Sequence, residues 1–173
     1  MTRIQLVLLA CILVLFSCGN KVKTKDELKA EFQVVADNLA SDTIAAKKFI
    51  LDAKTFINQP NEDTNKVHFQ KLIAETYTMM GDYDKAIEEW DLLRNTYVRH
   101  NLSAEALFKK AFLISEMKGL KESSRPLYEE FLIKYPNHRL AEAASFQIAN
   151  LEANNEELLL RILSSADSTS VHK

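Results

Sequence analysis

Four histidines and two cysteines are the side chains in this 173-residue sequence best suited to metal binding or nucleophilic chemistry. The histidines lie at positions 68, 100, 138 and 172, and none has the HExxH spacing of a zinc-binding helix. The sequence also has no paired-cysteine metal motif, no GxSxG elbow and no glycine-rich phosphate loop. We therefore predict no catalytic residue, no metal site and no cofactor.

Two of the histidines, His100 and His138, are 38 residues apart, which is also the spacing of other matching residues in the chain. A residue that recurs with the architecture is usually structural, so we expect a structural role for both. The acidic pairs Glu88-Glu89, Glu129-Glu130 and Glu156-Glu157 have no neighbouring acid/base motif, and we expect them on solvated helix faces or at a helix start.

Both cysteines lie in the first eighteen residues, within a segment that reads as a leader. Arg3 precedes an apolar run from Ile4 to Phe16, which is shorter than the roughly 20 residues needed to span a bilayer. This pattern predicts a secretory signal peptide over residues 1–17, which would be removed together with Cys11.

The residues Leu15-Phe16-Ser17-Cys18 resemble the bacterial lipobox. The resemblance implies a lipoprotein in which Cys18 carries acyl chains such as palmitate, residues 18–25 form a tether, and the protein sits on the periplasmic face of the outer membrane. Several acyl chains together give stable anchoring. An ordinary signal peptide with an incidental cysteine is the alternative.

Composition narrows the possible fold and partners. The chain is 47% hydrophobic with only three Gly and three Pro, which favours helix. The formal charge is −2, and acidic and basic residues are mixed along the chain, so no electrostatic surface for nucleic acid is expected. We predict an all-α protein with no nucleic-acid partner.

Apolar residues at three-and-four spacing predict a helix over residues 26–39 and a second from Ser41 or Asp42 to about residue 57. Their apolar stripes include Phe32, Val35, Ala36, Ile44 and Phe49. Residues 58–63 then break the pattern with Asn, Asp and Pro. This segment predicts the end of a first helical hairpin.

Two further hairpins between residues 67 and 136 repeat each other at a spacing of 38 residues. The alignment places Gly81 on Gly119 and Trp90 on Tyr128, and it predicts helices at 67–80 and 84–97 followed by a second copy over 103–136. A period of this length is typical of helical solenoids, whose units stack to bury a continuous core.

The first of these copies resembles a tetratricopeptide repeat (TPR). The resemblance rests on residues at the family's signature positions, namely Ile73, Ala74, Tyr77, Gly81, Tyr83, Ala86, Trp90 and Leu93. The resemblance implies a TPR-like solenoid over residues 26–163, with about three helix pairs, a half-pair in which Phe146 falls on Phe108, and a capping helix at 156–163. We expect residues 164–173 to be a disordered tail.

The segment FLIKYPNHRLAEAASFQIANL is similar to a passage of short TPR lipoproteins of Bacteroidota. More distantly it resembles the TPR lipoprotein of the β-barrel assembly machinery and the periplasmic TPR protein that works with Tol–Pal. These relatives act as scaffolds, so the resemblance implies binding rather than catalysis.

In TPR arrays the first helix of each pair lines a concave groove, and the resemblance implies which residues would line it here. They are His68, Lys71, Glu75, Thr78, Met79, Lys109, Leu113, Glu116 and Met117. Lys71 and Lys109 are 38 residues apart and are predicted to meet a peptide carboxylate, or else to be ordinary solvated charges. Met79 and Met117 also correspond, and methionine suits adaptable contacts; the alternative is that both are core residues.

We therefore expect an outer-membrane-anchored scaffold that holds a protein or peptide partner in the cell envelope. A component of an outer-membrane assembly or of a Tol–Pal-like complex is one alternative. An envelope enzyme with an unrecognised site and a purely structural spacer are the others.

Overall fold

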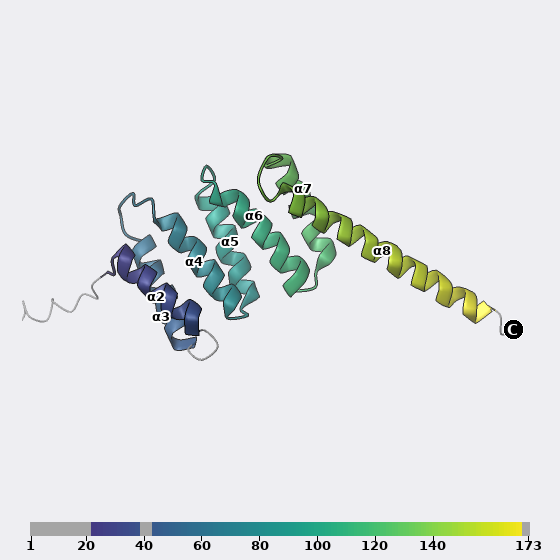
Figure 1. The fold of residues 1–173 in the computed structure, drawn as a ribbon, viewed down its shortest axis with the longest axis horizontal. Helices are drawn as coiled ribbons and strands as arrows, with labels where there is room; N and C mark the ends of the chain where they lie inside the picture. The colour runs from purple at the N-terminus through teal and green to yellow at the C-terminus, as the bar shows by residue number, and fades with distance from the viewer. Residues whose placement is uncertain (1–21, 39–42, 171–173) are drawn as a thin grey trace, which may run out of the picture.

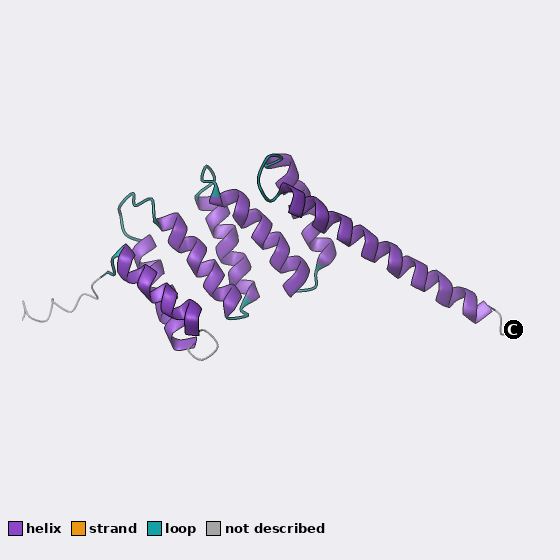
Figure 2. Ribbon diagram, in the orientation of Figure 1, coloured by secondary structure: helices purple, strands orange, loops and turns teal. Residues whose placement is uncertain are grey.

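The computed structural model describes residues 22–38 and 43–170, which form helices and no strand (Figure 2). The all-α prediction is confirmed for this part of the chain. The predicted signal peptide, Cys18 and the tether up to residue 21 lie outside the described residues, as do residues 171–173.

Within the described residues, seven α-helices follow one another in chain order (Figure 1). They are α2 (Lys25–Asn38), α3 (Thr43–Ile57), α4 (Lys66–Met79), α5 (Tyr83–Thr96), α6 (Leu102–Phe112), α7 (Lys121–Lys134) and α8 (Ala141–Ser170), with a π-helical turn, η1 (Leu113–Met117), continuing α6. Each packs mainly on the helices before and after it, and α4 also touches α2 and α6. The contacts are therefore mostly local in sequence.

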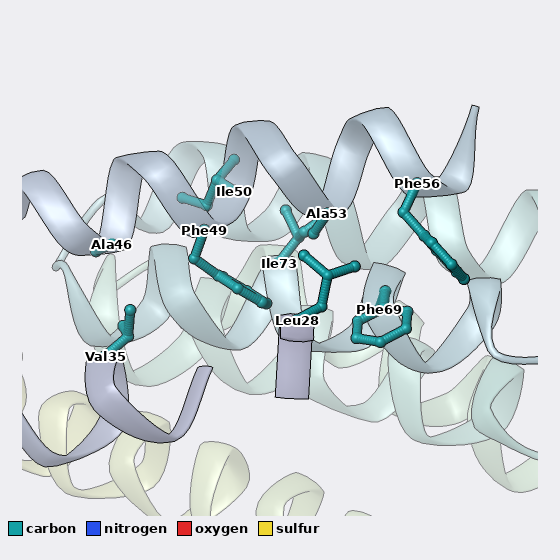
Figure 3. Packing of buried hydrophobic residues seen from close by; sticks show 9 residues of the cluster. All are labelled: Leu28, Val35, Ala46, Phe49, Ile50, Ala53, Phe56, Phe69 and Ile73. Carbon is teal, nitrogen blue, oxygen red and sulfur yellow. The ribbon is translucent and has the colours of Figure 1, made fainter. Parts of the chain in front are cut away.

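The first core cluster joins α2, α3 and α4 (Figure 3). Leu28 and Val35 lie two turns apart on one face of α2, and both are buried against the aromatic and aliphatic side chains of α3. Phe56 of α3 meets Phe69 of α4 edge-on with ring centroids 5.0 Å apart. Each fully buried side chain of this size contributes about 1.5–3 kcal/mol, so the first hairpin is fixed to the second.

Gly81 and Gly119 make the turns that close the second and third hairpins. Both have positive φ, 74° and 65°, a conformation that glycine adopts without steric cost. At the first turn the backbone N–H groups of Gly81 and Asp82 donate to Thr78 and Tyr77, the Schellman pattern that satisfies the last carbonyls of a helix. The predicted turns are therefore found at both glycines.

The π-helical turn η1 changes the register between the two copies. Ala74 precedes its turn glycine by seven residues, whereas the equally buried Ala111 precedes Gly119 by eight. The turn absorbs the extra residue, and the N–H of Leu120 accordingly reaches back six residues, to the carbonyl of Ile114. Upstream of η1 the repeats are offset by one residue, a rotation of about 100° around the helix.

The C-terminal region differs from the sequence prediction. The sequence predicts a half-pair, then a separate capping helix at 156–163, and then a disordered tail from Ser164. Instead, α8 is one helix from Ala141 to Ser170, so no separate cap folds back. The physical reason is that the chain after Pro136 contains no Gly or Pro to stop a helix.

Several residues placed in apolar stripes are exposed in the structure. Ala36 and Ile44 face solvent at the far end of the first hairpin. Phe146, expected to repeat the role of Phe108, is 64% exposed, whereas Phe108 is 9% exposed. Apolar spacing alone therefore did not decide which faces are covered.

Candidate functional site

An apolar pocket with a cavity volume of about 270 Å³ lies between α4 and the helix formed by α6 and η1. Its lining residues come from consecutive turns of these helices and from one side chain of α5: Glu75, Thr78, Met79, Trp90, Lys109, Phe112, Leu113 and Met117. We refer to this site as the methionine pocket.

Helical spacing explains how the lining is assembled. Glu75, Thr78 and Met79 lie at three-and-four spacing on one face of α4, and Lys109, Leu113 and Met117 lie four residues apart on the facing helix. Trp90 and Leu113 are fully buried, whereas Met79 and Met117 are 39% and 43% exposed. The pocket thus has buried apolar walls and a flexible thioether on each side of its opening.

The polar groups of the pocket are largely occupied. The Thr78 hydroxyl donates to the Ala74 carbonyl oxygen at 2.9 Å, and the Glu75 carboxylate lies 3.2 Å from the Lys71 ammonium. Lys109 has no ion-pair partner among the side chains that the structure describes. The site can therefore take an apolar group and offers it one available cation.

Six of the nine residues that sequence analysis assigned to a groove line this pocket, namely Glu75, Thr78, Met79, Lys109, Leu113 and Met117. The other three, His68, Lys71 and Glu116, do not. Glu116 is exposed and accepts a hydrogen bond from the Ser115 hydroxyl at 2.9 Å.

The His68 ring instead packs edge to face against the ring of His100, and the two ring centroids are 5.6 Å apart. His100 accepts a hydrogen bond at Nδ1 from the backbone N–H of Leu102, and His138 accepts the same bond from Leu140. The two repeated histidines therefore help to hold the starts of α6 and α8, which is a structural role.

Lys71 is already paired within the protein. Its ammonium lies 3.2 Å from Glu75 and 3.4 Å from Glu105, and Glu105 also accepts a hydrogen bond from Arg139. Burial alone would lower the pKa of Lys71, but the two carboxylates outweigh it and raise the pKa. The predicted pair of available lysines is thus reduced to Lys109.

Trp90 and Phe112 line the pocket but were not assigned to it from the sequence. Trp90 stands at one of the TPR signature positions; it is buried, and one side of it faces the cavity. Phe112 enters the pocket through the one-residue offset at η1, which the 38-residue alignment does not reveal.

No group of three or more His, Cys, Asp or Glu side chains within residues 22–38 and 43–170 is placed to hold a metal ion. Of the helices that the structure describes, none has the length and apolar content required to cross a membrane.

Comparison with known proteins gives no match, either to a protein-family model or to a curated protein.

Proposed function

We propose that this chain is a TPR-like helical-hairpin solenoid, an envelope scaffold that holds a protein or peptide partner. In this proposal the partner is captured at the methionine pocket, and acyl chains on Cys18 anchor the scaffold to the periplasmic face of the outer membrane. Successive helices that pack in chain order, with additional contacts from α4 to α2 and α6, support the solenoid assignment.

The observation that carries the proposal is the methionine pocket itself. Binding sites are concave, mostly apolar and furnished with a few polar groups, and this pocket has that character. Methionine side chains adapt to differently shaped apolar partners because they are unbranched and polarizable. A peptide segment that presents a large apolar side chain fits this site better than a small polar substrate does.

The pocket also favours a binding role over that of a spacer, which needs no concave apolar site. A place in an outer-membrane assembly or in a Tol–Pal-like complex is a narrower form of the same proposal.

In-cell cross-linking followed by affinity capture of the tagged chain tests the partner site. The test variant combines Met79→Glu with Met117→Glu, which places two charges at the opening of the pocket. The matched control is Ile133→Glu, because Ile133 is 80% exposed on α7 and does not line the pocket. We expect a defined set of captured proteins that survives in the control and falls at least about tenfold in the pocket variant. An unchanged set would reject the pocket as the partner site.

Cys18→Ala, run alongside, tests the membrane tether separately. We expect this variant to leave the membrane fraction and to lose its acyl mass, while the isolated protein keeps its pocket. Retention in the membrane with an unchanged mass would reject lipidation but not the partner site.

A further inference from the structure

The last helix is much longer than the helix on which it packs. At about 1.5 Å per residue, the 30 residues of α8 extend for about 45 Å, whereas the 14 residues of α7 extend for about 21 Å. Figure 1 shows α8 continuing well beyond the stack of the other helices. Roughly half of α8 therefore has none of the described helices of its own chain beside it.

The equivalent helix, α6, packs against a neighbouring helix on each of two sides. Ala106 of α6 and Leu113 of its continuation η1 belong to the cluster formed with α5, while Leu107, Phe108 and Ala111 pack with α7. Phe108 in particular meets the rings of Tyr128 and Phe131 of α7 at 5.6 Å and 5.8 Å. The two sides of α6 are thus covered by two different helices.

On α8, the described residues cover only one of these sides. Ala144 and Leu151, which lie 38 residues after Ala106 and Leu113, are buried like them. Phe146 and Ala149, which lie 38 residues after Phe108 and Ala111, are exposed. The exposed side of α8, which we call the bare side, therefore corresponds to the side of α6 that packs against α7. A helix with large apolar side chains is the kind of element that packs on such a side.

The bare side carries its own apolar stripe. Phe146, Ala153 and Leu160 follow at intervals of seven residues, which places them on one face of the helix. Leu160 is 60% exposed and Ala153 is also exposed. The stripe is symmetric about Ala153, with a large side chain seven residues away on either side.

We propose that a second copy of the chain covers this stripe, through an antiparallel pairing of two α8 helices centred on Ala153. Phe146 of each copy then packs against Leu160 of the other, and the small side chain of Ala153 lets the two backbones approach closely. The pairing supplies Phe146 with the large apolar neighbour that Tyr128 and Phe131 supply to Phe108. It is independent of the partner proposed for the methionine pocket.

Charge distinguishes the antiparallel arrangement from the parallel one. Centred on Ala153, the antiparallel pair sets Glu156 opposite Asn150 and Glu157 opposite Ala149, so no glutamate of the second half faces another. A parallel pair would place each glutamate beside its own copy, and like charges at such close range are destabilising. The antiparallel pair also puts the two helical stacks at opposite ends.

Engineered cysteines in the full-length chain, oxidised in intact cells, test this arrangement. Ala153→Cys brings the two thiols together at the symmetry point, whereas Ser145→Cys leaves them about 24 Å apart along the axis, although Ser145 is also exposed. We expect a reducible dimer for Ala153→Cys at least about tenfold more abundant than for Ser145→Cys, with the unmodified chain as background.

A second variant probes the apolar contact. Adding Phe146→Asp and Leu160→Asp to Ala153→Cys should lower the amount of dimer at least about tenfold. Adding Ile133→Asp instead, at another exposed apolar side chain, on α7, should not. Circular dichroism verifies that both chains keep their helix. The proposal would be overturned if Ser145→Cys and Ala153→Cys gave equal amounts of dimer, or if Ala153→Cys gave none. It would also be overturned if the dimer survived the two aspartates, or if an unrelated protein covered the stripe.

Discussion

Tyr128 is a fully buried tyrosine whose hydroxyl has no hydrogen-bond partner among the described residues. Its ring packs on Phe108, so the aromatic part contributes to the core between α6 and α7. Burial raises the pKa of its hydroxyl, and the nearby carboxylate of Glu116 raises it further. An unsatisfied buried hydroxyl costs about 1–3 kcal/mol relative to a satisfied one.

We therefore predict that Tyr128→Phe leaves the free energy of unfolding unchanged or raises it by up to about 1 kcal/mol, because the ring stays and the unpaired hydroxyl is removed. Urea denaturation monitored by circular dichroism measures the change. Tyr128→Ala is the comparison, with an expected loss of about 3–5 kcal/mol from the cavity it leaves. A clear destabilisation by Tyr128→Phe would show that the hydroxyl has a partner, such as an ordered water.

At the scale of elements, α5 and α7 are linked by a charged group at their surface. The Glu130 carboxylate of α7 accepts hydrogen bonds from Lys134 at 2.6 Å and from Arg94 of α5 at 2.9 Å. The bond from Lys134 lowers the pKa of Glu130 most, and Arg94 adds to the effect against a smaller contribution of burial. The link is partly exposed, so it stabilises the pair of helices by less than about 1 kcal/mol.

This link gives the stability a pH dependence of known sign. Because the pKa of Glu130 is lower in the folded state, its contribution is present above the ordinary value of 4.5 and is lost as the pH falls through the folded value. We predict that Glu130→Gln is less stable than the unmodified chain at pH 7 and that the difference closes below pH 4.5. Glu129→Gln, on the exposed side of the same helix, should show no such closing difference.

Most of the helix boundaries can be predicted from the sequence. Helices from α2 to α5 begin and end within one or two residues of the predicted positions, because apolar spacing, glycine turns and the break at residues 58–63 are local signals. The π-helical turn was not predicted, since one extra residue between Ala111 and Gly119 leaves the apolar pattern almost intact. Its consequence is a helix face rotated by about 100° upstream of η1, which the 38-residue alignment of Lys71 with Lys109 does not reveal.

In the C-terminal half of the chain, the sequence does not predict which apolar side chains are buried. Phe146 repeats the position of Phe108, yet whether it is buried depends on a helix that packs against it from elsewhere. No residue near Phe146 encodes that partner. Sequence spacing therefore predicted a helix around Phe146, but it predicted neither the continuity of α8 to Ser170 nor what covers Phe146.

At the scale of the whole molecule, the stack and the projecting half of α8 are energetically separable. Leu151 is the last α8 residue that the structure shows to be buried, and Leu159 and Leu160 are exposed. We predict that a chain ending after Ala153 has an unfolding free energy within about 1 kcal/mol of the full chain at low concentration, since few apolar contacts are lost. Chemical denaturation measures this, and a larger loss would mean that residues 154–173 pack on the stack.

The nearest-neighbour packing of the helices has a consequence for how the chain acquires its structure. Each hairpin completes its contacts as soon as the next helix is present, so no early segment waits for a distant late one. Low separation between contacting residues is associated with fast folding, and in such arrays structure can start in one unit and spread to the next. A chain delivered from its N-terminal end can thus consolidate progressively, with the apolar surface left open at any moment confined to its most recent helix.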